Sequence, residues 1–157
     1  MYQIITATEK HTEEIIQLWT KLMAIHKELD ADYFSETDNT VGEYKSDIEW
    51  HIKDDSNVIY IAIVDDVVVG YITAQLIFFS NSHYNLNSNC TVGDIMIDTN
   101  YQHLGIGKAF IEEIKKWSKL NSISKINLNV FSKNKRALSF FKNQGFDDQF
   151  NNLILEF

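Results

Sequence analysis

The 157-residue chain contains no proline, one arginine and one cysteine. The single cysteine, Cys90, cannot close an intramolecular disulfide, and the five histidines stand apart from one another without zinc-ligand spacing, so we expect no metal. No apolar run approaches the ~20 residues that cross a bilayer. Met1–Thr6 lacks the basic start and apolar core of a signal peptide. These absences predict a cytoplasmic protein without a membrane partner.

Positive charge is also in short supply. Fourteen basic against twenty-two acidic residues give a formal net charge of −8, which a phosphate backbone would repel, so we expect no nucleic-acid partner. Hydrophobic residues make up 45% of the chain and aromatic residues 13%, enough to build a packed core. The length and the lack of any linker-like stretch predict a single domain, residues 1–157.

Apolar periodicity places helices and strands along the chain in the order β-α-α-β-β-β-α-β-α-β(β), the last strand being one or two. Helices are predicted from Thr12 to Leu29, around Val41–Ile52, from Gly105 to Asn121 and around Ala137–Phe141. Strands are predicted at Gln3–Thr6, Val58–Val64, Val67–Phe79, Cys90–Asp98 and around Ile126–Val130, with one or two more within Phe146–Phe157. Asp65 and Asp66 form a two-residue hairpin turn, and Gly145 suits the end of the last helix. The order indicates a mixed α/β arrangement with one β-α-β crossover in its second half.

The segment Asp98–Ala109 carries the strongest functional signal. A strand end passes through a glycine-bearing turn directly into a helix, whose first amides have no partner within the helix and attract anions. Gly105 and Gly107 could equally serve tight packing. The segment lacks the Gly-Lys-Ser/Thr of a Walker loop and the third glycine of a dinucleotide fingerprint.

Together with its surroundings the segment resembles the GCN5-related N-acetyltransferases. Gln102-x-x-Gly105-x-Gly107 matches that family's motif A, after an apolar strand that includes Ile95 and Ile97. Asn134-x-x-Ala137, then Phe141, then Gly145-Phe146 matches motif B at every interval. The resemblance implies a GNAT-like α/β fold: a mixed, mostly antiparallel central sheet of six to seven strands with about four helices on its two faces.

The resemblance also implies acetyl-CoA as co-substrate and an acetyl-CoA-dependent N-acetyltransferase. Backbone groups of the strand would bind the pantetheine arm, and amides from about His103 to Lys108 would cradle the pyrophosphate. Gln102, which replaces the usual arginine, would shape the turn. Asn134 would hydrogen-bond pantetheine or its waters, and helix capping by Asn134 is compatible with that role. The residues implied in coenzyme binding are Ile95, Ile97, Gln102, His103, Leu104, Gly105, Ile106, Gly107, Lys108, Asn134 and Phe141.

Two positions depart from the family's catalytic pattern. Phe141 stands where many members have a tyrosine that protonates the leaving thiolate. Thr91 or Gly93 stands where others have a glutamate that acts as the general base. Asp94 is the nearest carboxylate and is the first candidate base, provided that a bulge turns it; it could instead be a structural hydrogen-bonding residue. His26 is the second candidate because its unperturbed pKa suits base chemistry.

The acidic stretch after the first predicted helix suggests the acceptor. Asp30, Tyr33 and Glu36 are the candidate acceptor-binding residues, and with the net charge they favour a small cationic amine, aminoglycoside-like or polyamine-like, attacking the acetyl group directly. Two alternatives stay open: acetylation of a protein lysine or N-terminus, and a non-catalytic acyl-CoA-binding or regulatory module. Homodimers are common in the family, and the C-terminal aromatics Phe146, Phe150 and Phe157 are candidates for that contact.

Overall fold

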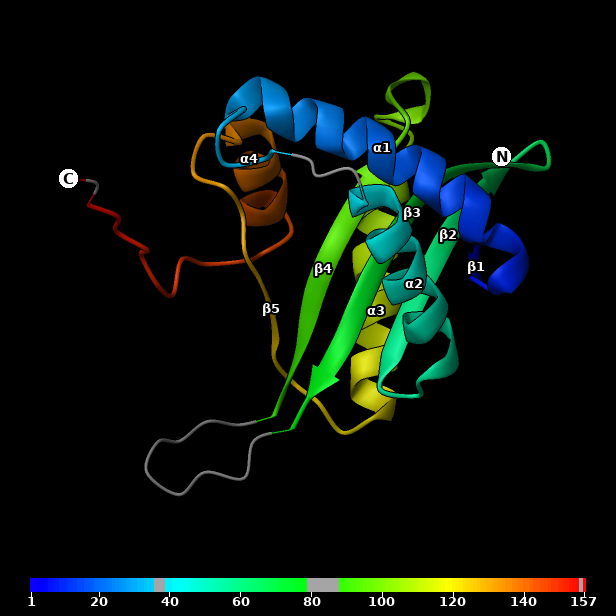
Figure 1. Cartoon of the computed structure of the whole chain (residues 1–157). Helices are drawn as coiled ribbons and strands as arrows, with labels where there is room; N and C mark the ends of the chain where they lie inside the picture. The colour runs from blue at the N-terminus through cyan, green and yellow to red at the C-terminus, as the bar shows by residue number, and fades with distance from the viewer. Residues whose placement is uncertain (36–38, 79–87, 156) are drawn as a thin grey trace.

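The computed structural model describes residues 1–35, 39–78, 88–155 and 157. Its sheet has five strands in the order β1-β2-β3-β4-β5 (Figure 1). The strands are β1 (Gln3–Thr6), β2 (Asn57–Val64), β3 (Val67–Ile77), β4 (Asn89–Ile97) and β5 (Ile126–Leu128). The α-helices are α1 (Thr12–Leu29), α2 (Thr40–Lys53), α3 (Ile106–Leu120) and α4 (Lys135–Asn143), with short 3-10 turns η1 (Glu9–His11) and η2 (Thr99–Tyr101).

The first four strands pair antiparallel, and β5 lies parallel to β4 after the crossover through α3. Asp65 and Asp66 both have positive φ, as the hairpin between β2 and β3 requires of a two-residue turn that follows the strand twist. The predicted α/β class, the mostly antiparallel sheet and the four helices are therefore confirmed.

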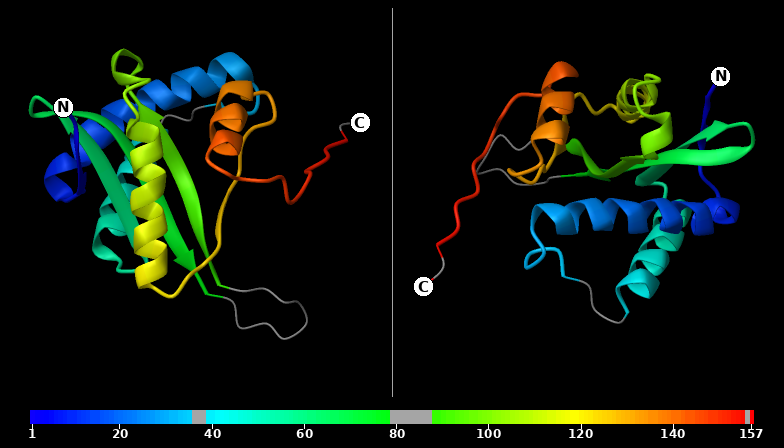
Figure 2. Two further views of the ribbon diagram at one scale, coloured as in Figure 1. Left: turned by 180° about the vertical axis from the view of Figure 1, so that it is seen from behind. Right: turned by 90° about the horizontal axis from the view of Figure 1, so that it is seen from above.

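The helices cover the two faces of the sheet in pairs (Figure 2). On one face α1 and α2 bury a cluster that includes Trp19, Ile48 and Tyr71. On the other face α3 and α4 bury a second cluster around Phe110, Ile114 and Phe141. The three- and four-residue apolar spacing of each helix supplies these contacts. Among the described residues, no helix combines the length and apolar character of a membrane span.

The C-terminal segment differs from the prediction. The one or two strands expected within Phe146–Phe157 do not form in the described residues, so the sheet has five strands rather than six or seven. Leu153 is 91% exposed and Phe150 87% exposed, and Figure 1 shows the segment leading away from the sheet. The last strand of the sheet, β5, is only three residues long, so its outer edge offers few backbone groups to pair with. β-Propensity reports a side-chain preference, whereas a strand also needs a partner.

Candidate functional site

The site is positioned by the divergence of β4 and β5. The two strands pair only at Cys90↔Ile126, Thr91↔Asn127 and Val92↔Leu128. Beyond Val92, β4 continues to Ile97 beside β3, while the chain after Leu128 leaves the sheet (Figure 1). One edge of β4 from Gly93 to Ile97 is thus left without a strand partner, and its backbone groups need partners of another kind.

A β-bulge at Gly93 and Asp94 decides which groups face that open edge. The pairing of β3 with β4 shifts by one residue between Ile72↔Ile95 and Ala74↔Val92. Before the bulge, the Cys90 amide donates toward the β5 side; after it, the Asp98 amide donates to Val69 of β3. Alternation therefore turns the backbone groups of Ile95 and Ile97 toward the open edge.

The bulge also sets the direction of the Asp94 side chain. Cys90 and Val92 point into the core beneath α3, whereas after the bulge Ile95 and Ile97 pack on that side and Met96 packs toward α1 and α2. Asp94 consequently lies on the α1–α2 face, where its carboxylate meets Tyr44 of α2. A bulge that redirects the Asp94 side chain was the condition under which the sequence made Asp94 a candidate base.

The amino end of α3 lies at the far end of the open edge. Gly105, the residue before the helix, has φ +85°, a conformation that favours glycine, and His103 also has positive φ. The Ala109 amide is the first to bond back to Gly105, at 3.0 Å, so the amides of Ile106, Gly107 and Lys108 have no partner within the helix. Free amides at a helix amino end, together with the helix dipole, are suited to hold an anion.

Gly107 has a packing role as well. A Cβ there would lie 2.9 Å from Cζ of Phe140 in α4 and 3.4 Å from Cδ1 of Ile97. The alternative of tight packing therefore holds for Gly107. Ile106 is buried in the core, while His103, Leu104 and the Lys108 side chain are exposed around the turn.

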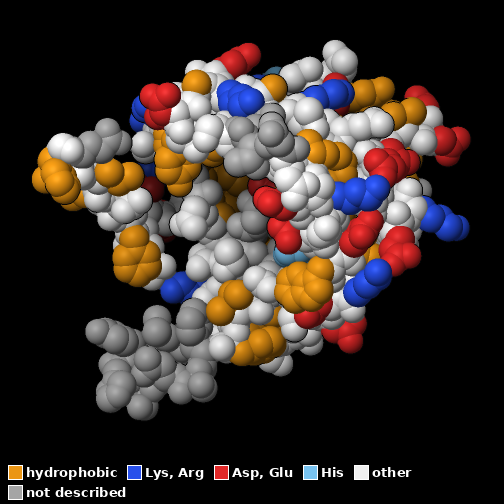
Figure 3. Space-filling model, viewed as in Figure 1, with side chains coloured by type: hydrophobic (Ala, Val, Ile, Leu, Met, Phe, Trp, Pro, Cys, Tyr) orange, Lys and Arg blue, Asp and Glu red, His pale blue; other side chains and the backbone are white. Residues whose placement is uncertain are grey.

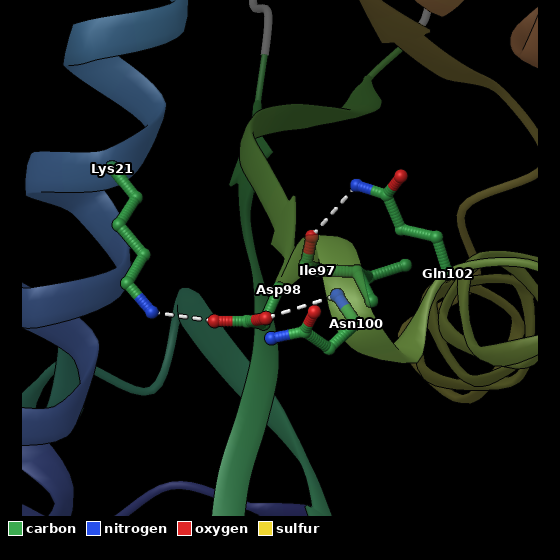
Figure 4. Close-up of polar contacts among 5 residues, drawn as sticks. All are labelled: Lys21, Ile97, Asp98, Asn100 and Gln102. Carbon is green, nitrogen blue, oxygen red and sulfur yellow. Dashed lines mark hydrogen bonds and ion pairs between the residues drawn. The ribbon is translucent and has the colours of Figure 1, made fainter.

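Gln102 links this turn to both neighbouring elements. Its Nε2 donates to the Ile97 carbonyl at 3.0 Å (Figure 4). Its Oε1 accepts from Nη2 of Arg136 in α4. The Gln102 amide thus contacts the end of β4 and also holds the chain's only arginine at the turn. One of the backbone acceptors assigned to the coenzyme, the Ile97 carbonyl, is already shared with Gln102.

The next residue of the strand end faces the other way. Figure 4 shows Asp98 between Lys21 of α1 and Asn100, whose amide it accepts at 3.1 Å. These contacts lower the pKa of Asp98, the bond from Lys21 most of all. The end of β4 is therefore fixed to α1 through Asp98 and to α4 through Gln102.

The motif B residues lie in α4 and at its two ends. Asn134 Oδ1 accepts from the Ala137 amide at 3.0 Å, so Asn134 caps α4, a role that is compatible with the expected coenzyme contact. Phe141 is buried, with its ring edge-on to Phe140 and Phe146. Gly145 has φ +90°, and the Phe146 amide returns to the Phe141 carbonyl at 3.1 Å, which closes the helix. Phe141 offers no acidic proton.

The two candidate bases lie on the same side of the sheet. Burial raises the pKa of Asp94, while the Tyr44 hydrogen bond and the charges of His26 and His51 lower it. Burial lowers the pKa of His26, opposed by the charge of Asp94, and its ring stacks on Phe34 with centroids 4.6 Å apart. Asp94 and His26 therefore lie close enough for the charge of each to shift the pKa of the other.

The loop after α1 packs against the loop between β5 and α4. Asp30 lies 2.6 Å from Lys133 Nζ, and Tyr33, 67% exposed, stacks on Phe131. The Lys133 hydrogen bond is the main cause of the lowered pKa of Asp30. Glu36, the third candidate acceptor residue, lies outside the described residues. Acidic and basic side chains lie interspersed over α1 and α2 (Figure 3).

Three residues of this region were missed by the sequence reading: Arg136, Lys133 and Tyr44. Arg136 carried a signal, since it is the only arginine and lies two residues after Asn134 within motif B. Lys133 and Tyr44 had none, because their partners Asp30 and Asp94 are distant in the sequence. In the described parts of the chain, no three potential metal ligands cluster.

Comparison with known proteins shows the family and the fold of the chain. The family model described as "Acetyltransferase (GNAT) family" matches residues 22–146. A mutant of the BH1408 protein from Bacillus halodurans has a TM-score of 0.90 at 20% identity, with 99% of each chain covered. The aminoglycoside antibiotic 6'-N-acetyltransferase AAC(6')-IG from Acinetobacter haemolyticus has a TM-score of 0.78 at 12% identity, covering 98% of this chain and 97% of that one. Aminoglycoside N-acetyltransferase AAC(6')-Iy, in complex with CoA, has a TM-score of 0.75 at 14% identity over 98% of both chains.

Proposed function

The chain belongs to the GNAT family of acetyltransferases, which use acetyl-CoA, and we propose that it acetylates a primary amine of a small cationic molecule, aminoglycoside-like or polyamine-like. One observation carries the proposal. The unpartnered edge of β4 leads from the free amides of α3 to Asp94, whose carboxylate lies on the α1–α2 face of the sheet. Donor and acceptor sites thus meet at one strand.

The residues present fit the coenzyme. Backbone groups of Ile95 and Ile97 offer strand-like hydrogen bonds to the pantetheine amides, with the Ile97 carbonyl shared with Gln102. Amides of Ile106–Lys108 offer the pyrophosphate an anion site. Arg136, held by Gln102, restores the positive charge that glutamine lacks at motif A. The coenzyme supplies the activated acetyl group as a thioester.

Asp94 is the proposed base. It takes a proton from the acceptor ammonium, directly or through water, and the free amine nitrogen then attacks the acetyl carbonyl. The new C–N bond replaces the C–S bond, the thiolate leaves, and the second amine proton goes to solvent. Since Phe141 offers no proton, water protonates the thiolate. A raised pKa makes Asp94 a stronger base than an exposed aspartate, provided that it is ionised at the working pH.

The acceptor proposal is supported by charge and by fold likeness. The net charge of −8 favours a cationic acceptor, and Asp30 and the exposed ring of Tyr33 lie in the loop that follows α1. Several structures with the same fold are aminoglycoside acetyltransferases, although their identity to this chain is below 20%. Asp30 is partly neutralised by Lys133, so its contribution depends on that contact.

The test is thiol release from acetyl-CoA with matched panels of aminoglycosides, polyamines, and lysine or N-terminal peptides. We expect turnover with one of the first two classes, and KM for that amine to rise in Asp30→Asn while KM for acetyl-CoA stays unchanged. Turnover restricted to peptides would overturn the small-molecule proposal. CoA-dependent thermal stabilisation without turnover on any amine would favour the binding-module alternative.

We also propose that the protein forms a homodimer through its C-terminal segment. Support comes from Phe150, Leu153, Leu155 and Phe157, which are all more than four-fifths exposed. Hydrophobic side chains of this segment stand clear of the body at one side of Figure 3. Such clustering of apolar surface is uncommon on a monomer and is typical of an interface.

A further inference from the structure

Three polar groups form a chain of hydrogen bonds beneath α2. Tyr44 Oη lies 2.7 Å from Oδ2 of Asp94 and 3.0 Å from Oη of Tyr71. Tyr71 is fully buried in β3, and the Tyr44 ring stacks on Trp19 with centroids 4.2 Å apart and planes 11° from parallel. The phenol of Tyr44 is therefore held on both its ring and its hydroxyl.

The chemistry of these groups decides which group donates and which accepts in each of the two hydrogen bonds. An ionised carboxylate only accepts hydrogen bonds, so Tyr44 donates to Asp94. Its oxygen is then free to accept the hydroxyl hydrogen of Tyr71. The hydroxyl hydrogens of Tyr44 and Tyr71 therefore both point toward Asp94. This arrangement stabilises the ionised carboxylate, which is the form that a base requires.

We propose that Tyr44 is a positioning residue for acetyl transfer: it holds the Asp94 carboxylate toward the acceptor and keeps it ionised, and it thereby couples α2 to the reacting strand. The inference rests on the proposed function, in which Asp94 is the base. Tyr44 touches neither substrate in this assignment and acts through Asp94.

Asp94 is subject to opposing influences from every element packed around it. Burial raises its pKa, whereas Tyr44 and His51 of α2 and His26 of α1 lower it. Tyr71 of β3 acts on it through Tyr44. The Tyr44 hydrogen bond counteracts the effect of burial on the pKa of Asp94. Without the Tyr44 hydroxyl, that pKa rises further and the fraction of Asp94 ionised at a given pH falls.

The decisive variant is Tyr44→Phe, which keeps the ring on Trp19 and removes only the donor. We expect kcat to fall roughly tenfold to a hundredfold, the scale of a hydrogen bond to a charged group. The acid limb of the kcat/KM profile should move to higher pH, with KM for acetyl-CoA unchanged. Tyr71→Phe should shift the limb in the same direction by less. Tyr60→Phe, which removes a hydroxyl from the other face of the sheet, should leave the limb in place.

A second measurement does not depend on turnover. Titration of the Asp94 carboxyl carbon by NMR should give a higher midpoint in Tyr44→Phe than in the wild type. If no amine is acetylated, the proposed function fails and this titration alone decides whether Tyr44 controls Asp94. An unchanged midpoint overturns the inference, as does a raised midpoint with an unchanged pH–rate profile, since Tyr44 would then not act on the reaction.

Discussion

Lys133 Nζ lies 2.6 Å from Oδ2 of Asp30 and ties the loop after α1 to the loop before α4. The same two loops stack Tyr33 and Phe34 on Phe131, and Lys133 lies over the Phe131 ring. The contact joins the candidate acceptor loop to the segment just before motif B, although Asp30 and Lys133 are 103 residues apart in the sequence.

Lys133→Met should strengthen binding of a cationic acceptor. The substitution frees the Asp30 carboxylate while the methionine chain can still cover Phe131. We expect KM for the acceptor to fall roughly twofold to fivefold, the scale of one solvent-exposed ion pair. Steady-state kinetics with the amine found in the acceptor screen measures the change. Lys135→Met removes the same charge nearby and should have less effect; equal changes in both variants would assign the effect to net charge instead.

Local rules in the sequence account for most of the fold. Apolar spacing located α1 to α4, and Gly145, predicted at the end of the last helix, has the positive φ of such a glycine. The C-terminal strands failed because pairing depends on an available sheet edge, which no local pattern encodes. For the same reason the sequence located motif A but missed Arg136, whose contact with Gln102 exists only when α4 packs beside the turn.

Arg136→Gln should weaken coenzyme binding through its phosphates. Loss of the guanidinium removes a charge from the turn, so we expect the Kd for CoA to rise roughly tenfold at low salt, the scale of a hydrogen bond to a charged group. The difference from the wild type should shrink at high salt. Calorimetric titration with CoA and with pantetheine, which has no phosphates, separates the two parts of the site. Equal loss for both ligands would contradict a phosphate role, and Lys135→Gln serves as the charge-matched control.

Gly93→Ala should disturb the bulge that directs Asp94. The new Cβ would lie 2.6 Å from Oγ1 of Thr73, the atom that accepts the Asp94 amide at 2.9 Å. Thr73 can avoid the clash only by moving Oγ1, which leaves that amide without its acceptor. We expect a loss of about 1–3 kcal/mol in the free energy of unfolding, as for other overpacked sites, together with lower kcat.

A double-mutant cycle tests this cause. In Thr73→Ala/Gly93→Ala the clash partner is gone, so the double variant should be less destabilised than the sum of the single variants, as measured by denaturant unfolding. Strict additivity would mean that the destabilisation in Gly93→Ala does not come from the clash with Thr73. Gly93 was also the one sequence signal for the bulge, since an isolated glycine in a strand favours such an irregularity.

Polar substitutions in the C-terminal segment should abolish the proposed dimer. In an extended segment Leu153 and Leu155 share one face, and both are largely exposed, so Leu153→Ser/Leu155→Ser removes apolar surface without touching either core. Light scattering during size-exclusion chromatography should give a dimer for the wild type and a monomer for the variant, with CoA-dependent thermal stabilisation retained in both. Leu120→Ser, at an 85% exposed position on α3, should remain dimeric. A monomeric wild type, or a variant as dimeric as the wild type, would show that this segment does not hold two chains together.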